Sequence, residues 1–139
     1  LFLMRQAFLK ASKGLWKAFP LIIGTILLVG LLTTLVPPEA FSTIFGHSAG
    51  IDVLLGSAAG SVAAGNAATS YILGGELLGN GISLLAVTAF ITAWVTVGVV
   101  QLPAETSILG KRFALLRNAA SFILTFLVAL ATATAVMLL

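Results

Sequence analysis

The chain has 139 residues, of which 60% are hydrophobic and 8% charged, and its mean hydropathy is +1.18. A soluble domain has about a quarter charged residues, so this chain has too few to cover a water-facing surface. The net charge of +3 is too small to indicate a nucleic-acid-binding protein. The absence of cysteine excludes thiolate metal sites. We therefore expect an all-α, multi-pass integral protein of the cell (cytoplasmic or inner) membrane.

Residues 1–19 predict a basic amphipathic helix that lies in the membrane interface. One narrow face of this helix carries Gln6, Lys10, Lys13 and Lys17, and the opposite side carries aromatic and aliphatic residues. A helix of this kind lays its apolar face on the bilayer and turns its lysines toward anionic headgroups. The lipid bilayer is therefore the first expected partner.

Residues 20–139 predict a single transmembrane domain that begins with a new helix start at Pro20. Full spans are expected at about residues 21–36, 82–100 and 119–139. Residues 104–117 are short, basic and too polar to span alone. The segment Gln101-Leu102-Pro103 is expected to break the second span, because proline cannot continue a helix.

A broken helix or re-entrant hairpin is predicted at about residues 51–79, an apolar segment that is interrupted near Gly65 and Asn66. A break at membrane depth frees backbone groups that can serve a small ligand. The candidate substrate-binding residues here are Ser61, Gly65, Asn66, Thr69, Ser70 and Tyr71. Two alternatives stay open: the polar residues only cap the second half-helix, and the small residues Gly56, Ser57, Gly60 and Ser61 only pack against another helix.

Thr96, Gln101 and Glu105 complete the predicted site. An acid inside a membrane is costly unless it is paired or used, so Glu105 could bind a coupling proton or cation. The alternative is a loop carboxylate that pairs with Lys111 or Arg112 in the interface. One histidine with scattered acids does not form a recognisable metal site. The sequence shows no nucleophile–base pair and no phosphate loop, so we expect neither an enzyme nor a cofactor.

The direction of the chain through the membrane depends on the hairpin. If residues 51–79 cross once, four spans place the basic residues Lys111, Arg112 and Arg117 outside, against the positive-inside rule. If residues 51–79 enter and leave on one side, these residues lie inside and agree with the rule. A third possibility is insertion in both directions, with pairing as an antiparallel dimer. We favour the hairpin.

From about Phe19 onward, the order of features resembles one half of the ArsP-type predicted permease family. The landmarks are Val36-Pro37-Pro38-Glu39, Phe45-Gly46, the broken helix, and Gly79-Asn80-Gly81-Ile82-Ser83 before a span that reads Ala86-Val87-Thr88-Ala89-Phe90. Full-length relatives carry two such units and are implicated in efflux of arsenicals and metals, so the resemblance implies a half-permease that completes itself as a homodimer. Relatives often have a cysteine pair in the broken helix, which this chain lacks between Ser61 and Thr69, so thiophilic chemistry does not carry over.

The function expected from these features is that of a small half-size permease. It would act as a homodimeric secondary transporter of a small solute or ion, with efflux as one direction and its site at broken helices near the membrane midplane. The alternatives are a channel and a non-transporting accessory or scaffold subunit of a larger membrane complex. No ATP-binding motif is present in the sequence, so the energy would come from an ion gradient or another subunit.

Overall fold

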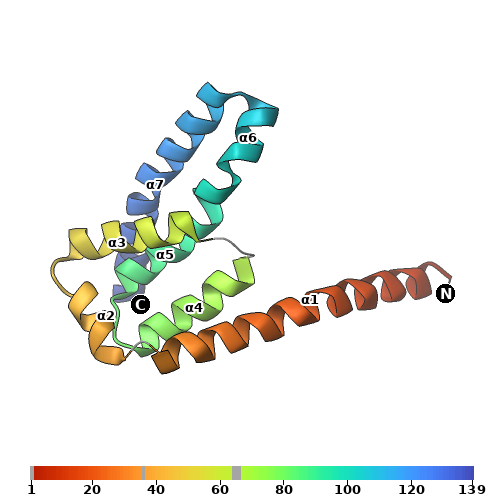
Figure 1. Ribbon diagram of the computed structural model, residues 1–139, viewed down its shortest axis with the longest axis horizontal. Helices are drawn as coiled ribbons and strands as arrows, with labels where there is room; N and C mark the ends of the chain where they lie inside the picture. Colours follow the sequence, from red (N-terminus) through yellow and green to blue (C-terminus); the bar gives the residue numbers. More distant parts are fainter. Residues whose placement is uncertain (1, 36, 64–66) are drawn as a thin grey trace. The chain divides into compact units, whose positions relative to one another are not determined.

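The computed structural model describes residues 2–35, 37–63 and 67–139, and every regular element in these ranges is a helix (Figure 1). The chain forms two compact units, Leu1–Leu35 and Val36–Leu139. The all-α class expected from the sequence is therefore confirmed.

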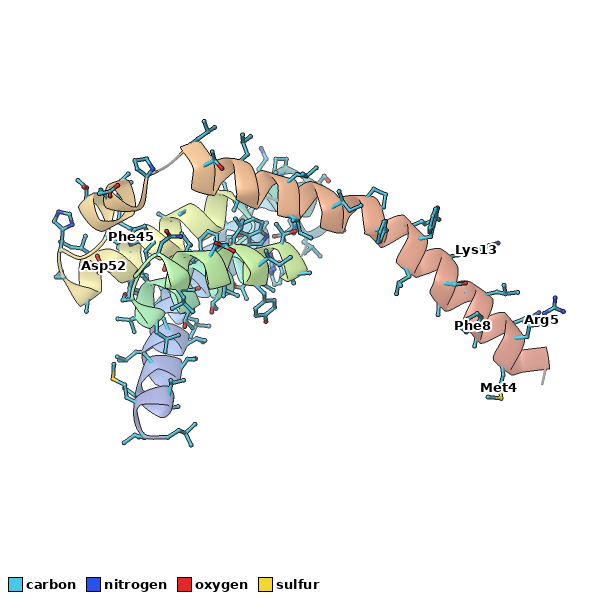
Figure 2. All side chains as sticks on the ribbon, turned by 90° about the horizontal axis from the view of Figure 1, so that it is seen from below. Met4, Arg5, Phe8, Lys13, Phe45 and Asp52 are labelled. Carbon is cyan, nitrogen blue, oxygen red and sulfur yellow. The ribbon has the colours of Figure 1, made fainter. Side chains whose placement is uncertain are left out.

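The first unit is a single helix, α1 (Phe2–Leu35), which is 34 residues long and contains Pro20 in its interior. The helix start that the sequence predicts at Pro20 is not found. A proline costs a helix one backbone hydrogen bond, and the long runs of good helix formers on both sides carry the helix through. Figure 2 shows Arg5 and Lys13 on one side of α1, with Met4 and Phe8 on the other. This amphipathic character fits the predicted interfacial helix, whose place in the membrane stays a prediction.

The second unit begins with α2 (Pro38–Ile44), α3 (Ala49–Val62), α4 (Ala67–Gly79) and α5 (Leu84–Thr96), and it continues with the short 3-10 helix η1 (Val99–Gln101), α6 (Leu102–Leu109) and α7 (Lys111–Met137). Serine side chains cap two of these helices: Ser48 accepts from the Ile51 N–H before α3, and Ser83 accepts from the Ala86 N–H before α5. Each hydroxyl oxygen satisfies one of the N–H groups that a helix leaves unpaired at its start.

Helix α5 lies at the centre of this unit and packs against α3, α4 and α7. Helix α3 runs parallel to it, because Gly56 meets Ala86 and, one turn further on, Gly60 meets Phe90. Helix α4 runs in the opposite direction, because Gly74 lies against Val87 and Ile91 while Leu77 packs on the cluster that contains Ile82. Helix α7 is also antiparallel to α5, since Arg117 contacts Thr96 while Ala129 packs with Ala89.

Small residues allow the close approach of α3 and α5. A Cβ added to Gly56 would overlap the carbonyl oxygen of Ala86, and one added to Gly60 would overlap that of Phe90. Side chains at these positions would hold the two backbones apart, as in other small-xxx-small contacts between helices. For Gly56 and Gly60, the structure therefore assigns the packing role that was one of the two open alternatives.

Two interruptions divide the helices of this unit. Helix α3 ends at Val62 and α4 begins at Ala67, which agrees with a break near Gly65 and Asn66, although residues 64–66 lie outside the described ranges. The second break differs from the prediction: it lies at Gly98, whose φ of 53° is left-handed, and not at Gln101–Pro103. Glycine adopts this conformation without strain.

Pro103 lies within the first turn of α6, where its missing N–H has no helical partner to lose. The predicted span at residues 82–100 is therefore a helix of 13 residues, α5, that is followed by a turn. Helix α7 begins directly after Gly110, whose φ is 85°, so the predicted basic segment 104–117 is divided between α6 and the first turns of α7.

Two stretches among the described residues are long and apolar enough to cross a membrane: Leu84–Leu109, with 26 residues, and Lys111–Met137, with 27. Helices α3 and α4 have 14 and 13 residues. At about 1.5 Å per residue they are about 20 Å long, which is shorter than the roughly 30 Å of a bilayer's hydrocarbon core. The number of spans stays a prediction.

Candidate functional site

The two helix interruptions lie at the same end of the α3–α4–α5 group. Because α3 is parallel and α4 antiparallel to α5, the last residue of α3, the first residue of α4 and the last residue of α5 all lie at this end (Figure 1). Helix α3 also contacts η1. The broken helices that the sequence places in two separate segments are thus brought to one level of the bundle.

A charged cluster lies beside the second interruption, where α6 turns back onto α7. Arg117 forms an ion pair with Glu105 through Nη1 and Oε1. Asn118 Nδ2 donates a hydrogen bond to the other carboxylate oxygen, Glu105 Oε2, over 3.0 Å. Glu105 is therefore paired across the α6–α7 hairpin with Arg117, and not with Lys111 or Arg112 as the loop alternative expected.

Arg117 also reaches the end of α5. Its Nη2 donates to the carbonyl oxygen of Thr96 over 3.4 Å, in the last turn of a helix whose carbonyls lack helical donors. The Thr96 hydroxyl is used within its own helix, where it donates to the Thr92 carbonyl over 2.7 Å. One guanidinium group therefore neutralises a carboxylate of α6 and donates a hydrogen bond to a carbonyl of α5.

Exposure differs between the two partners of the ion pair. The side chain of Arg117 is 39% exposed, whereas that of Glu105 is 17% exposed. Gln101, another predicted site residue, is exposed on η1 next to Gly98. Arg117 is thus the more accessible partner of the ion pair, and Gln101 is a further exposed polar residue at the second interruption.

Asn118 has one unpaired buried atom. Its side chain is 7% exposed, and Nδ2 bonds to both Glu105 and the Ala114 carbonyl. Its Oδ1 and the Oγ of Ser57 are the buried side-chain polar atoms that have no hydrogen-bond partner within the described ranges. Leaving such an atom unpaired costs about 1–3 kcal/mol, so each calls for an explanation.

The predicted residues of α3 and α4 make mostly local contacts. The Ser61 hydroxyl donates to the Ala58 carbonyl over 2.8 Å, and the Ser70 hydroxyl donates to the Ala67 carbonyl over 2.7 Å. Both serines and Thr69 are buried, while Tyr71 is 64% exposed. Gly65 and Asn66 lie outside the described residues. The hydroxyl protons of Ser61 and Ser70 are therefore used inside their own helices, as serine often does in a helix.

Sequence reasoning missed two members of the cluster. Arg117 was placed in the short basic segment 104–117, and Asn118 precedes the span expected at about residues 119–139, so neither was a candidate site residue. A signal was present: Arg117 and Asn118 are adjacent polar residues at the head of a long apolar run, and Glu105 lies at a similar distance on the other side of Gly110. A tight helical hairpin at Gly110 brings these positions face to face.

A buried acid of α3, Asp52, has a structural role. Asp52 is 6% exposed, and both of its carboxylate oxygens accept from the Gly46 N–H, at 3.0 and 3.1 Å. This contact ties the loop after α2 to α3, next to Phe45, which packs on the cluster around Ile82 (Figure 2). The sequence predicts only a favourable position in the first turn. His47 is exposed, and no group of three metal-binding side chains occurs in the part of the chain that the structure describes.

Comparison with protein-family models, with curated proteins and with solved structures found no match to this chain. The resemblance to ArsP-type permeases therefore stays a hypothesis.

Proposed function

We propose that this chain is a half-size permease of the cell membrane, which acts as a homodimeric secondary transporter of a small solute or ion. The observation that carries the proposal is the meeting of two helix interruptions and an interhelical ion pair at one level of the bundle. Discontinuous helices around polar groups are how many transporters build a site near the midplane of the bilayer.

Integral membrane placement is supported by the surface of α7. Its exposed residues include many large apolar side chains: Ile123, Leu124, Leu127, Val128 and Leu130. A soluble monomer seldom exposes a continuous apolar surface of this extent. With the low fraction of charged residues, the hydrocarbon core of a bilayer is the environment that fits.

A re-entrant hairpin is supported by the directions and lengths of the helices. Helices α3 and α4 are each about 20 Å long, and the start of α3 and the end of α4 lie level with the start of α5. If α5 and α6 together cross the bilayer, the α3–α4 pair enters and leaves on the side where α5 begins. The end of α3 and the start of α4 would then lie at membrane depth, level with the end of α5.

The chemistry of this arrangement supports secondary transport. Short helices that end inside a bundle can rearrange about a fixed site without exposing unpaired backbone to lipid. One chain supplies one such unit, and a homodimer would supply two, as in the two-unit ArsP-type permeases that the sequence resembles. An ion gradient would drive the cycle.

The test uses the purified full chain in vesicles of phosphatidylethanolamine and phosphatidylglycerol. Currents are recorded on solid-supported membranes after concentration jumps of chloride, nitrate, sulfate, methanesulfonate, sodium or potassium. A transporter gives currents that saturate with concentration and depend on a counter-gradient. The double variant Glu105→Gln/Arg117→Gln should abolish them, while the matched pair Glu76→Gln/Arg112→Gln, at exposed positions, should not. Currents that rise linearly without saturation would indicate a channel, and no current with any of these solutes would favour an accessory or scaffold subunit.

A further inference from the structure

The two partners of the Glu105–Arg117 pair differ in one chemical property. A carboxylate can be discharged by a proton, whereas the guanidinium group of arginine stays charged in proteins. An ionised group inside a membrane is costly unless it has a partner. If the pair opens at membrane depth, Glu105 can become neutral, but Arg117 needs another anion.

We propose that Arg117 binds a small anion and that Glu105 takes up one proton as this anion binds. The inference rests on the proposed function, for which it names the substrate class and the coupling ion. In this exchange the contact between Arg117 and Glu105 breaks, the anion accepts hydrogen bonds from the guanidinium, and a proton from solution bonds to a carboxylate oxygen of Glu105. For a monovalent anion, the summed charge of the site is zero before and after, so no unpaired charge is left among the helices.

The exposures and distances fit these roles. Arg117 is the more accessible partner, at 39% against 17% for Glu105. Its bond to the Thr96 carbonyl is long, at 3.4 Å, so this donor can be taken over by a stronger acceptor. Glu105 is largely covered, which suits a group that exchanges a proton and does not bind a solute itself.

The unpaired atom of Asn118 also has a role in this exchange. An ionised Glu105 accepts a hydrogen bond from Asn118 Nδ2, but a protonated carboxyl needs an acceptor for its O–H. Rotation of the Asn118 amide would bring Oδ1, which has no partner among the described residues, to the proton on Glu105. The Ala114 carbonyl would lose its bond from Nδ2 but would keep the helical bond from the backbone. Asn118 can thus accept from the protonated carboxyl, while Nδ2 moves to the place of Oδ1, where the described residues offer no partner.

Nothing else on the neighbouring helices competes for the roles of this pair. The described elements that pack most closely against α6 are α7 and η1. Helix α7 contributes Arg117 to Glu105, with Lys111 and Arg112 exposed in its first turn; η1 and α5 carry no charged residue. The remaining acids belong to other helices: Glu39, Asp52 and Glu76. A cation at Glu105 would instead leave Arg117 charged with no counter-ion, which is why the geometry points to an anion.

The test measures anion binding and proton uptake by the full chain in detergent. Chloride, nitrate, sulfate and methanesulfonate are titrated by calorimetry over a range of pH, in buffers that differ in ionisation enthalpy. These anions come from strong acids, so their own charge does not change. Because protonation of Glu105 increases as the pH falls, at least one anion should bind more tightly at lower pH. Its affinity should weaken by about tenfold per pH unit where Glu105 is ionised, with uptake of about one proton.

Variants assign the two roles. Glu105→Gln mimics the protonated carboxyl, so it should bind the same anion with an affinity that does not depend on pH and with no proton uptake. Arg117→Gln should lose binding, Arg117→Lys should retain it more weakly, and Glu76→Gln should behave as the wild type. Size-exclusion profiles check folding. If Arg117→Gln does not fold, Glu105→Gln and Arg117→Lys decide the outcome.

Three results would overturn the proposal. The wild type could bind anions with an affinity that does not depend on pH, Glu105→Gln could show the same dependence of affinity on pH as the wild type, or none of these anions could bind to the wild type or to Glu105→Gln. Sodium or potassium binding that Glu105→Gln abolishes would also overturn it. The vesicle currents separate this failure from failure of the proposed function. Saturable currents that do not change with pH or in Glu105→Gln would mean that the chain is a transporter without this anion site. Anion binding with proton uptake but without current would mean that the site exists and the chain does not transport.

Discussion

The contact between α3 and α5 makes a quantitative prediction about Gly56. In the interior of a helix, Gly→Ala alone stabilises by about 0.5–1 kcal/mol, because alanine loses less backbone freedom on folding. At Gly56 the added methyl group would overlap the carbonyl oxygen of Ala86. A backbone atom inside a helix has no rotamer that could relieve this overlap. The helices must move apart instead.

The magnitude follows from this separation. A gap of about 0.5–1 Å forfeits about a quarter to a half of the dispersion attraction across a contact, and overpacking of this kind costs about 1–3 kcal/mol. After the gain in helix propensity is subtracted, Gly56→Ala should lower the free energy of unfolding by about 0.5–2 kcal/mol. Gly60→Ala should have a similar effect for the same reason.

The two substitutions should not add. One displacement of α3 from α5 relieves both overlaps, so the double variant should lose less than the sum of the single losses. The matched control is Gly75→Ala on α4, where an added Cβ meets no atom within 4 Å. It should gain about 0.5–1 kcal/mol from helix propensity alone.

The assay is reversible unfolding in mixed micelles of a mild detergent and dodecyl sulfate. Fluorescence of Trp94 reports on α5, where its ring lies edge-on to Phe90 at 5.4 Å, and Trp16→Phe removes the signal from α1. Changes in the free energy of unfolding that are equal in sign and size for Gly56→Ala and Gly75→Ala would refute the close contact between α3 and α5.

Two further predictions concern the hairpin and the second break. Single cysteines that replace His47 and Gly79, on either side of the α3–α4 pair, should react with an impermeant thiol reagent from the same face of the membrane. A cysteine that replaces Ser107 should react from the opposite face. Labelling of positions 47 and 79 from opposite faces would mean that the α3–α4 pair crosses the bilayer. At the break, Gly98→Ala should destabilise by about 1–2 kcal/mol because of the left-handed backbone, while Pro103→Ala should be nearly neutral, and the reverse order in micelle unfolding would contradict this account.

Local rules were sufficient for several features of the chain. The apolar composition and helical patterning predict the all-α class, and the small residues after Ile51 predict an interrupted helix. The excess of apolar residues after Asn118 predicts the last long helix. Each of these conclusions depends on residues that are close in sequence, where propensity and capping act.

The positions of the helix breaks needed the tertiary structure. Proline is the usual breaker, yet α1 continues through Pro20 and Pro103 lies in the first turn of a helix. The second break falls at Gly98, one of 14 glycines in the chain. Only the packing of neighbouring helices decides which glycine turns left-handed, because the intrinsic preferences of all of them are the same.

The membership of the candidate site was also decided by tertiary structure. The sequence could single out Glu105 as a rare acid, but its partners Arg117 and Asn118 lie across a helical hairpin. Such a pairing depends on the turn at Gly110 and on the angle between α6 and α7, and the angle has no local signature. The sequence by itself therefore determined the kinds of helices and where the polar residues occur along them, whereas the directions in which the helices pack determined which polar residues meet.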